Sequence, residues 1–81
     1  MSSAEVAPTL DRLARGQSAL IVQIGGERDL RRRLLAMGLV PGETVTLTAI
    51  APLGDPLELM IKGYRLSLRK DEARLVAVEP A

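Results

Sequence analysis

Apolar and polar residues alternate along most of this chain with the period of two that is typical of half-buried β-strands. After residue 42 the alternation predicts three strands, at residues 43–50, 57–61 and 64–69. Ser18 to Ile24 is mostly aliphatic instead, which predicts a strand buried on both faces. With a last short strand at residues 75–78, the pattern predicts a mostly β protein with five strands.

One segment departs from this period and has the spacing of a helix. Leu30, Leu34 and Met37 recur at intervals of three and four residues, which predicts an amphipathic helix at residues 27–37. Gly38 follows at the position where helices commonly end with a residue free to adopt positive φ. The rest of the chain then supplies a sheet on which this helix packs.

Short connections between the strands indicate an antiparallel arrangement. Lys62-Gly63 separates two strands by two residues, as in a tight hairpin with positive φ at the glycine. Residues 51–56 contain two prolines and a glycine and are expected to form a loop. Residues 10–14 and 70–73 are predicted to form single helical turns. We therefore expect a small five-stranded antiparallel barrel with the helix covering one open end.

The length of 81 residues corresponds to one domain, which we place at residues 9–79 after a flexible N-terminus at residues 1–8. Apolar residues make up 47% of the chain, but Tyr64 is the only aromatic residue, so the core must be aliphatic. No signal peptide is recognisable, and no apolar run approaches the roughly 20 residues that span a bilayer. We expect a cytoplasmic protein without direct membrane insertion.

The residue types that carry most enzyme and metal chemistry are missing. The chain has no cysteine and no histidine, which removes the thiolate nucleophile and the commonest general base and metal ligands. The acidic pairs Asp55 with Glu58 and Asp71 with Glu72 lack the alternate spacing of a calcium loop. We therefore predict a non-enzyme without a metal site or cofactor.

The run Arg31–Arg33 is the most prominent charged feature, although the net charge is only +1. On a helix these three side chains point 100° apart, and Arg32 shares the outer face with Arg28. Either they form a solvated rim whose stems cover the edges of the core, or they contact an anion or an acidic partner. Nucleic acid is less favoured, because the chain lacks aromatic residues on which bases stack.

Leu35 lies on the arginine side of the predicted helix, and Leu39 and Val40 follow just past its end. A broad barrel rim would bury all three. Alternatively, they form an apolar patch rimmed by arginine, which is typical of a protein-binding surface. Both interpretations are open from the sequence.

Several segments, in this order, resemble the FeoA family (ferrous iron transport protein A) and its related SH3-like domains. They are Arg33 to Leu39, Pro41-Gly42, Pro52 to Pro56, and Leu66 to Arg69 followed by Glu72-Ala73. The resemblance extends over Leu10 to Val78 and implies an SH3-like five-stranded barrel with one helix. It further implies a small cytosolic accessory protein of ferrous iron uptake that binds and modulates the membrane transporter FeoB at its cytosolic, GTP-binding G domain region.

Two alternatives belong to other classes of protein. Related SH3-like domains are appended to metal-dependent transcription repressors, but Met1 to Leu10 leaves no room for a preceding DNA-binding domain. A small RNA- or ribosome-associated barrel is supported only by Arg31–Arg33. The sequence does not determine the oligomeric state, a monomer or a weak oligomer.

The residues expected to contact the partner lie at the helix and in the proline-rich loop. They are Arg28, Arg32, Leu35 and Leu39 at the helix, and Pro52, Leu53 and Asp55 in the loop.

Overall fold

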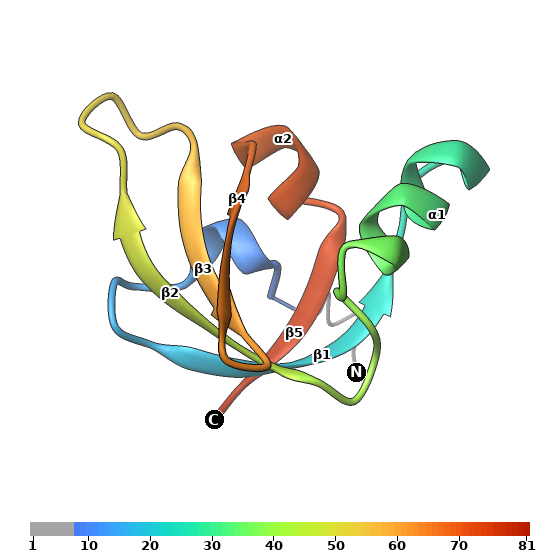
Figure 1. Cartoon of the computed structure of the whole chain (residues 1–81), viewed down its shortest axis with the longest axis horizontal. Coiled ribbons are helices and arrows are strands. Elements are labelled where there is room, and N and C mark those ends of the chain that lie inside the picture. The colour runs from blue at the N-terminus through green and yellow to red at the C-terminus, as the bar shows by residue number, and fades with distance from the viewer. Residues whose placement is uncertain (1–7) are drawn as a thin grey trace, which may run out of the picture.

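In the computed structural model, which describes residues 8–81, five antiparallel strands form one curved sheet (Figure 1). The strands are β1 (Ser18–Ile24), β2 (Thr44–Ile50), β3 (Leu57–Ile61), β4 (Tyr64–Leu68) and β5 (Val76–Pro80). Their order across the sheet is β4-β3-β2-β1-β5, so β4 and β5 form its two edges. The predicted fold class, mostly β with five antiparallel strands and one main helix, is confirmed.

Three helical segments accompany the sheet. A 3-10 turn, η1 (Leu10–Arg12), precedes β1, α1 (Arg28–Ala36) connects β1 to β2, and α2 (Lys70–Ala73) connects β4 to β5. Figure 1 shows α1, α2 and the loop between β2 and β3 at the same end of the curved sheet.

The N-terminal segment is described only from its last residues. Residues 1–7, which hold most of the predicted flexible terminus, lie outside the described residues. Pro8 was included in that prediction, but its carbonyl oxygen accepts a hydrogen bond from the N–H of Val78 at 2.9 Å. The chain is therefore anchored to the edge of β5 from Pro8 onward.

The core is entirely aliphatic, as the composition predicted. Alternate residues of β2 and β3 point inward, and no polar or charged side chain is buried within residues 8–81. The buried side chains are Leu10, Leu13, Ala19, Ile21, Ile24, Leu34, Leu39, Val45, Leu47, Leu57, Leu59, Ile61, Leu68, Ala73, Val76 and Val78. Each strand contributes to this one cluster, which explains why the sheet curves around it.

The prediction that β1 is buried on both faces is wrong. Ala19, Ile21 and Ile24 are buried, but Leu20 and Val22 are 37% and 38% exposed. The sheet is a single layer curved around the core, so the outer face of β1 has no layer to cover it. An irregularity in the pairing with β5 after Ile21 shifts the alternation by one residue and returns Ile24 to the core.

The hairpin between β3 and β4 has the predicted two-residue connection. Gly63 has φ +85° as expected, and Lys62 also has positive φ, at +52°. Positive φ at both central residues is the geometry of a type I′ turn, whose twist matches that of the flanking strands. Lys62 forms an ion pair with Glu43 at 3.4 Å.

Candidate partner-binding surface

Helix α1 exposes most of its surface. Of the three residues in its inner stripe, Leu34 is fully buried. Leu30 and Met37 are only partly buried, and Met37 lies just past the end of the helix. On the opposite side, Arg28, Arg32 and Leu35 recur at intervals of four and three residues and are all exposed. We call these three residues the outer helix face.

The arginines of α1 differ in whether their side chains have a partner in the fold. The guanidinium of Arg33 donates to the carboxylate of Glu72 and thereby ties α1 to α2. Arg28 and Arg32 form no hydrogen bond or ion pair through their side chains with any of residues 8–81. Leu35, which is 36% exposed, lies on the same face. The outer helix face thus presents one apolar side chain beside two unpaired cations.

The end of α1 is closed by Gly38, as predicted. Gly38 has φ +104°, and its N–H donates to the carbonyl of Leu35 at 3.0 Å. The N–H of Leu39 then donates back to the carbonyl of Leu34 at 3.2 Å. These two bonds form a Schellman motif, which satisfies carbonyl groups that a helix end otherwise leaves unpaired.

The same motif shows that Leu39 was wrongly predicted as a contact residue. Its side chain is 0% exposed and belongs to the core cluster together with Leu34. The positive φ of Gly38 reverses the chain, so the residue after it packs back against the helix. Val40, the next residue, is 37% exposed.

Tyr64 at the start of β4 fastens the end of α1 to the hairpin. Its hydroxyl donates to the carbonyl oxygen of Met37 at 2.7 Å. A Cβ atom at Gly38 would collide with this hydroxyl, so a glycine is required there by space as well as by φ. No such role for Tyr64 was predicted from the sequence, because no spacing rule connects residue 64 with residue 37.

The loop of residues 51–56 forms a second exposed region. It is closed by the N–H of Ala51, which donates to the carbonyl of Pro56 at 3.1 Å. Leu53 at its tip is 96% exposed, and Pro52 beside it is exposed as well. One carboxylate oxygen of Asp55 accepts the N–H of Lys70 at 3.0 Å, so this side chain holds the loop to the start of α2.

A shallow hollow of about 330 Å³ lies beside that contact and is lined by Asp55, Pro56 and Arg69.

The helix and loop residues predicted as contacts do not form one continuous patch. Figure 1 shows the loop and α1 on opposite sides of α2. The outer helix face and the loop are therefore two separate candidate surfaces.

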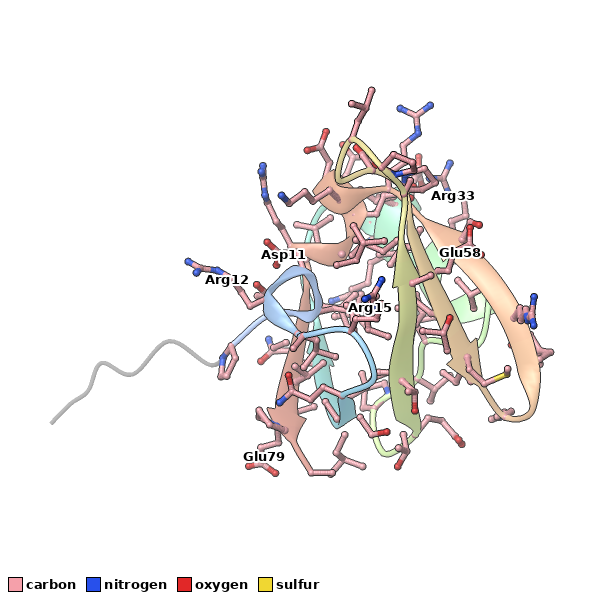
Figure 2. All side chains as sticks on the ribbon, turned by 90° about the vertical axis from the view of Figure 1, so that its left-hand side faces the viewer. Asp11, Arg12, Arg15, Arg33, Glu58 and Glu79 are labelled. Carbon is pink, nitrogen blue, oxygen red and sulfur yellow. The ribbon has the colours of Figure 1, made fainter. Side chains whose placement is uncertain are left out.

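The charged side chains are spread over the molecule. Figure 2 shows Arg12, Arg15 and Arg33 on different parts of the surface, with Arg12 on the η1 side. Within residues 8–81, no group of three or more His, Cys, Asp or Glu side chains is placed to hold a metal ion. None of the helices in this part of the chain is long and apolar enough to cross a membrane.

The family model of the FeoA domain matches residues 9–80, nearly the whole chain. The chain belongs to the FeoA family. FeoA domains are small SH3-like accessory domains associated with ferrous iron transport, and they are not a known enzyme family.

Relatives of known sequence and structure agree with this assignment. A Porphyromonas gingivalis fusion of Fe(2+) transport protein A with the Fe(2+) transporter FeoB is 41% identical over 70 residues, which is 86% of this chain and 8% of that protein. Iron(II) transport protein A from Clostridium thermocellum has a TM-score of 0.87 and 39% identity over 91% of this chain and 46% of that chain. A zinc complex of Stenotrophomonas maltophilia FeoA, described as an SH3 domain protein, has a TM-score of 0.80 and 34% identity over 90% of this chain and 91% of that chain.

A manganese-dependent transcriptional repressor shares the fold as well. It has a TM-score of 0.86 but only 15% identity, over 96% of this chain and 38% of that chain. This likeness concerns the fold alone and carries no DNA-binding or regulatory role to this FeoA domain.

Proposed function

We propose that this chain is a cytoplasmic accessory protein of ferrous iron uptake that binds the cytosolic portion of a FeoB-type transporter and modulates it. The observation that supports this proposal is the P. gingivalis fusion, in which a related domain and the transporter form one polypeptide. A covalent link holds two domains together at an effective concentration of about millimolar, even when their contact is weak. Where the two are not linked, binding depends on an interface between them.

The outer helix face is the surface that fits this role best. Arg28 and Arg32 have no partner among the described residues, so the fold does not need their charges. Arginine is enriched at protein interfaces, because its guanidinium stacks, forms several hydrogen bonds and is only weakly hydrated. Leu35 would supply the apolar contact.

The loop of residues 51–56 is a second contact region in this proposal. Pro52 and Leu53 are exposed, and no described residue covers the leucine at the tip. Asp55 contributes less, because its carboxylate already accepts a hydrogen bond from the start of α2. Leu39 is no part of the proposed surface.

The proposal is tested by measuring the affinity of this chain for the cytosolic portion of its cognate FeoB. Arg32→Glu and Arg12→Glu make the same charge reversal on exposed side chains of different elements. We expect Arg32→Glu to weaken binding by about tenfold or more, the effect of an interface residue worth at least 1.4 kcal/mol. Arg12→Glu should change the affinity by less than about twofold.

Adding Leu35→Asp should abolish measurable binding without unfolding the chain, because Leu35 is exposed and outside the core cluster. Circular dichroism and the thermal midpoint of each variant check the fold. Equal binding by wild type and the Arg32→Glu/Leu35→Asp variant would show that the outer helix face is the wrong surface. Absence of any binding by the wild-type chain would refute the proposed function itself.

A further inference from the structure

The edge strand β4 has main-chain groups that the fold does not use. In an antiparallel sheet, successive residues direct their N–H and C=O groups to opposite neighbouring strands. The N–H of Leu47 donates toward β1, to the carbonyl of Gln17 at 3.0 Å. Thr46, the residue before it, therefore bonds toward β3, where its register partner is Met60.

The same alternation continues into the last strand. Because Met60 bonds to β2, its neighbours Leu59 and Ile61 bond to β4, where they pair with Leu66 and Tyr64. Arg65 and Ser67 therefore direct both N–H groups and both carbonyl groups away from the sheet. None of these groups forms a hydrogen bond with the main chain or a side chain of residues 8–81.

The opposite edge of the sheet, β5, is covered by the N-terminal segment. On β5, the N–H of Val78 donates to the carbonyl of Pro8, and Thr9 forms an antiparallel bridge with Ala77. At the other edge, β4 pairs with β3 alone, and no strand of the described part of the chain pairs with its other side. The fold covers one edge with its own N-terminal segment and leaves the other open.

The side chains at this open edge are basic. Arg65 and Arg69 are exposed and form no ion pair within the described part of the chain. Two acidic residues lie near them, and both already accept a hydrogen bond. The carboxylate of Glu58 accepts from the hydroxyl of Ser67 at 2.8 Å, and that of Asp55, which lines a hollow with Arg69, accepts from the main chain at the start of α2 at 3.0 Å. Charged side chains on an edge strand also discourage pairing between identical edges. Two copies joined along β4 would bring four arginines together, which disfavours a second copy as the occupant.

We propose that the free edge of β4 binds an extended acidic segment of the partner as a sixth strand of the sheet. Main-chain hydrogen bonds to Arg65 and Ser67 would supply affinity, and the arginines at positions 65 and 69 would select acidic side chains. Tyr64, the first residue of β4, is bonded to Met37 just past the end of α1, so this edge begins beside the C-terminal end of the helix. The inference rests on the proposed function, because it takes the cytosolic portion of FeoB as the source of the segment.

Proline at position 67 gives a direct test. Ser67→Pro removes an N–H group that points away from the sheet, a position where an edge strand tolerates proline. Ser67→Ala is the matched control, because it loses the same hydroxyl but keeps the N–H group. We expect Ser67→Pro to bind the cytosolic portion of FeoB at least tenfold more weakly than Ser67→Ala. Equal affinities of the two variants would overturn the inference.

Amide hydrogen exchange of the wild-type chain provides a readout that does not depend on how the proline variant folds. In the free chain, the N–H groups of Arg65 and Ser67 should exchange fast, while those of Tyr64 and Leu66 are protected by β3. In the complex with the cytosolic portion of FeoB, exchange at residues 65 and 67 should slow at least tenfold.

The outcomes separate this inference from the proposed function. Binding without added protection at residues 65 and 67 would overturn the inference and leave the proposed function standing. Protection that appears in the free chain as its concentration rises would assign the edge to a second copy instead. If the wild-type chain does not bind at all, the proposed function fails and the inference fails with it.

Discussion

The contact between Gly38 and Tyr64 offers a quantitative test of how α1 is held. Gly38→Ala places a side chain at φ +104°, and its Cβ collides with the Tyr64 hydroxyl. The tyrosine ring must then move and lose its hydrogen bond to Met37, which measures 2.7 Å. The variant therefore combines backbone strain with the loss of one tertiary contact.

Each part has an expected magnitude. Left-handed backbone costs a residue with a Cβ about 1–2 kcal/mol, and a lost hydrogen bond typically costs about 0.5–1.5 kcal/mol. Gly38→Ala should therefore lower the free energy of unfolding by about 1.5–3.5 kcal/mol. Tyr64→Phe alone should lower it only by the cost of the lost hydrogen bond, about 0.5–1.5 kcal/mol. Once Gly38→Ala is present, Tyr64→Phe should cost almost nothing, because the bond is already broken.

Urea unfolding of the two single variants and the double variant measures these values from the midpoints at constant m. Gly54→Ala is a matched control, because Gly54 has φ +90° with no atom within 4 Å of the position that a Cβ would take, so only the strain of about 1–2 kcal/mol applies. Our account is refuted if Gly38→Ala costs no more than Gly54→Ala and the double variant equals the sum of the singles.

Four further substitutions have predicted effects on stability, which are read from the same kind of unfolding curve. Leu47→Ala should cost about 2–5 kcal/mol, because the side chain is fully buried; a loss below about 0.5 kcal/mol would place it outside the core. Glu72→Ala should cost about 1–3 kcal/mol, because its carboxylate accepts both the main-chain N–H of Arg69 and the guanidinium of Arg33. Arg33→Ala should cost at most about 1 kcal/mol, because Arg33 is an exposed ion-pair partner. A larger loss of stability for Arg33→Ala than for Glu72→Ala would show that the ion pair contributes more than the hydrogen bond to the N–H of Arg69. Leu53→Ser should leave stability within about 0.5 kcal/mol, since its side chain is 96% exposed.

The features that the sequence predicted correctly depend on local chemistry. The hairpin at Lys62-Gly63 follows from a two-residue connection between alternating segments, and the cap at Gly38 follows from a glycine after an apolar helical stripe. The spacing of the outer helix face is local as well, because Arg28, Arg32 and Leu35 are four and three residues apart. All three are exposed, which the sequence left open for Leu35, and their role as contacts stays a prediction.

The features that it did not predict depend on contacts between distant segments. Leu39 was expected at a surface, but the chain reversal after the helix carries it into the core. Leu20 was expected to be buried, but whether a second layer covers β1 is a property of the whole fold. Likewise, the bond from Tyr64 to Met37 joins residues that are close only after α1 and the hairpin have packed.

The open edge at Arg65 and Ser67 is an intermediate case. The alternation within β4 indicates which residues point outward, but only the strand order shows that no strand pairs with that edge. The sequence signal that would have suggested an open edge is a two-residue hairpin followed by arginine at residues 65 and 69, on the same side of the alternation.

An action of this FeoA domain on a FeoB-type transporter should be measurable as a change in GTP hydrolysis. The rate of the cytosolic portion of the cognate FeoB would be measured while the wild-type chain is titrated in. We expect a saturable change in rate whose midpoint equals the dissociation constant of the complex, and this midpoint should rise at least tenfold with Arg32→Glu. A rate that stays constant at every concentration of the chain, with no binding detected, would contradict it.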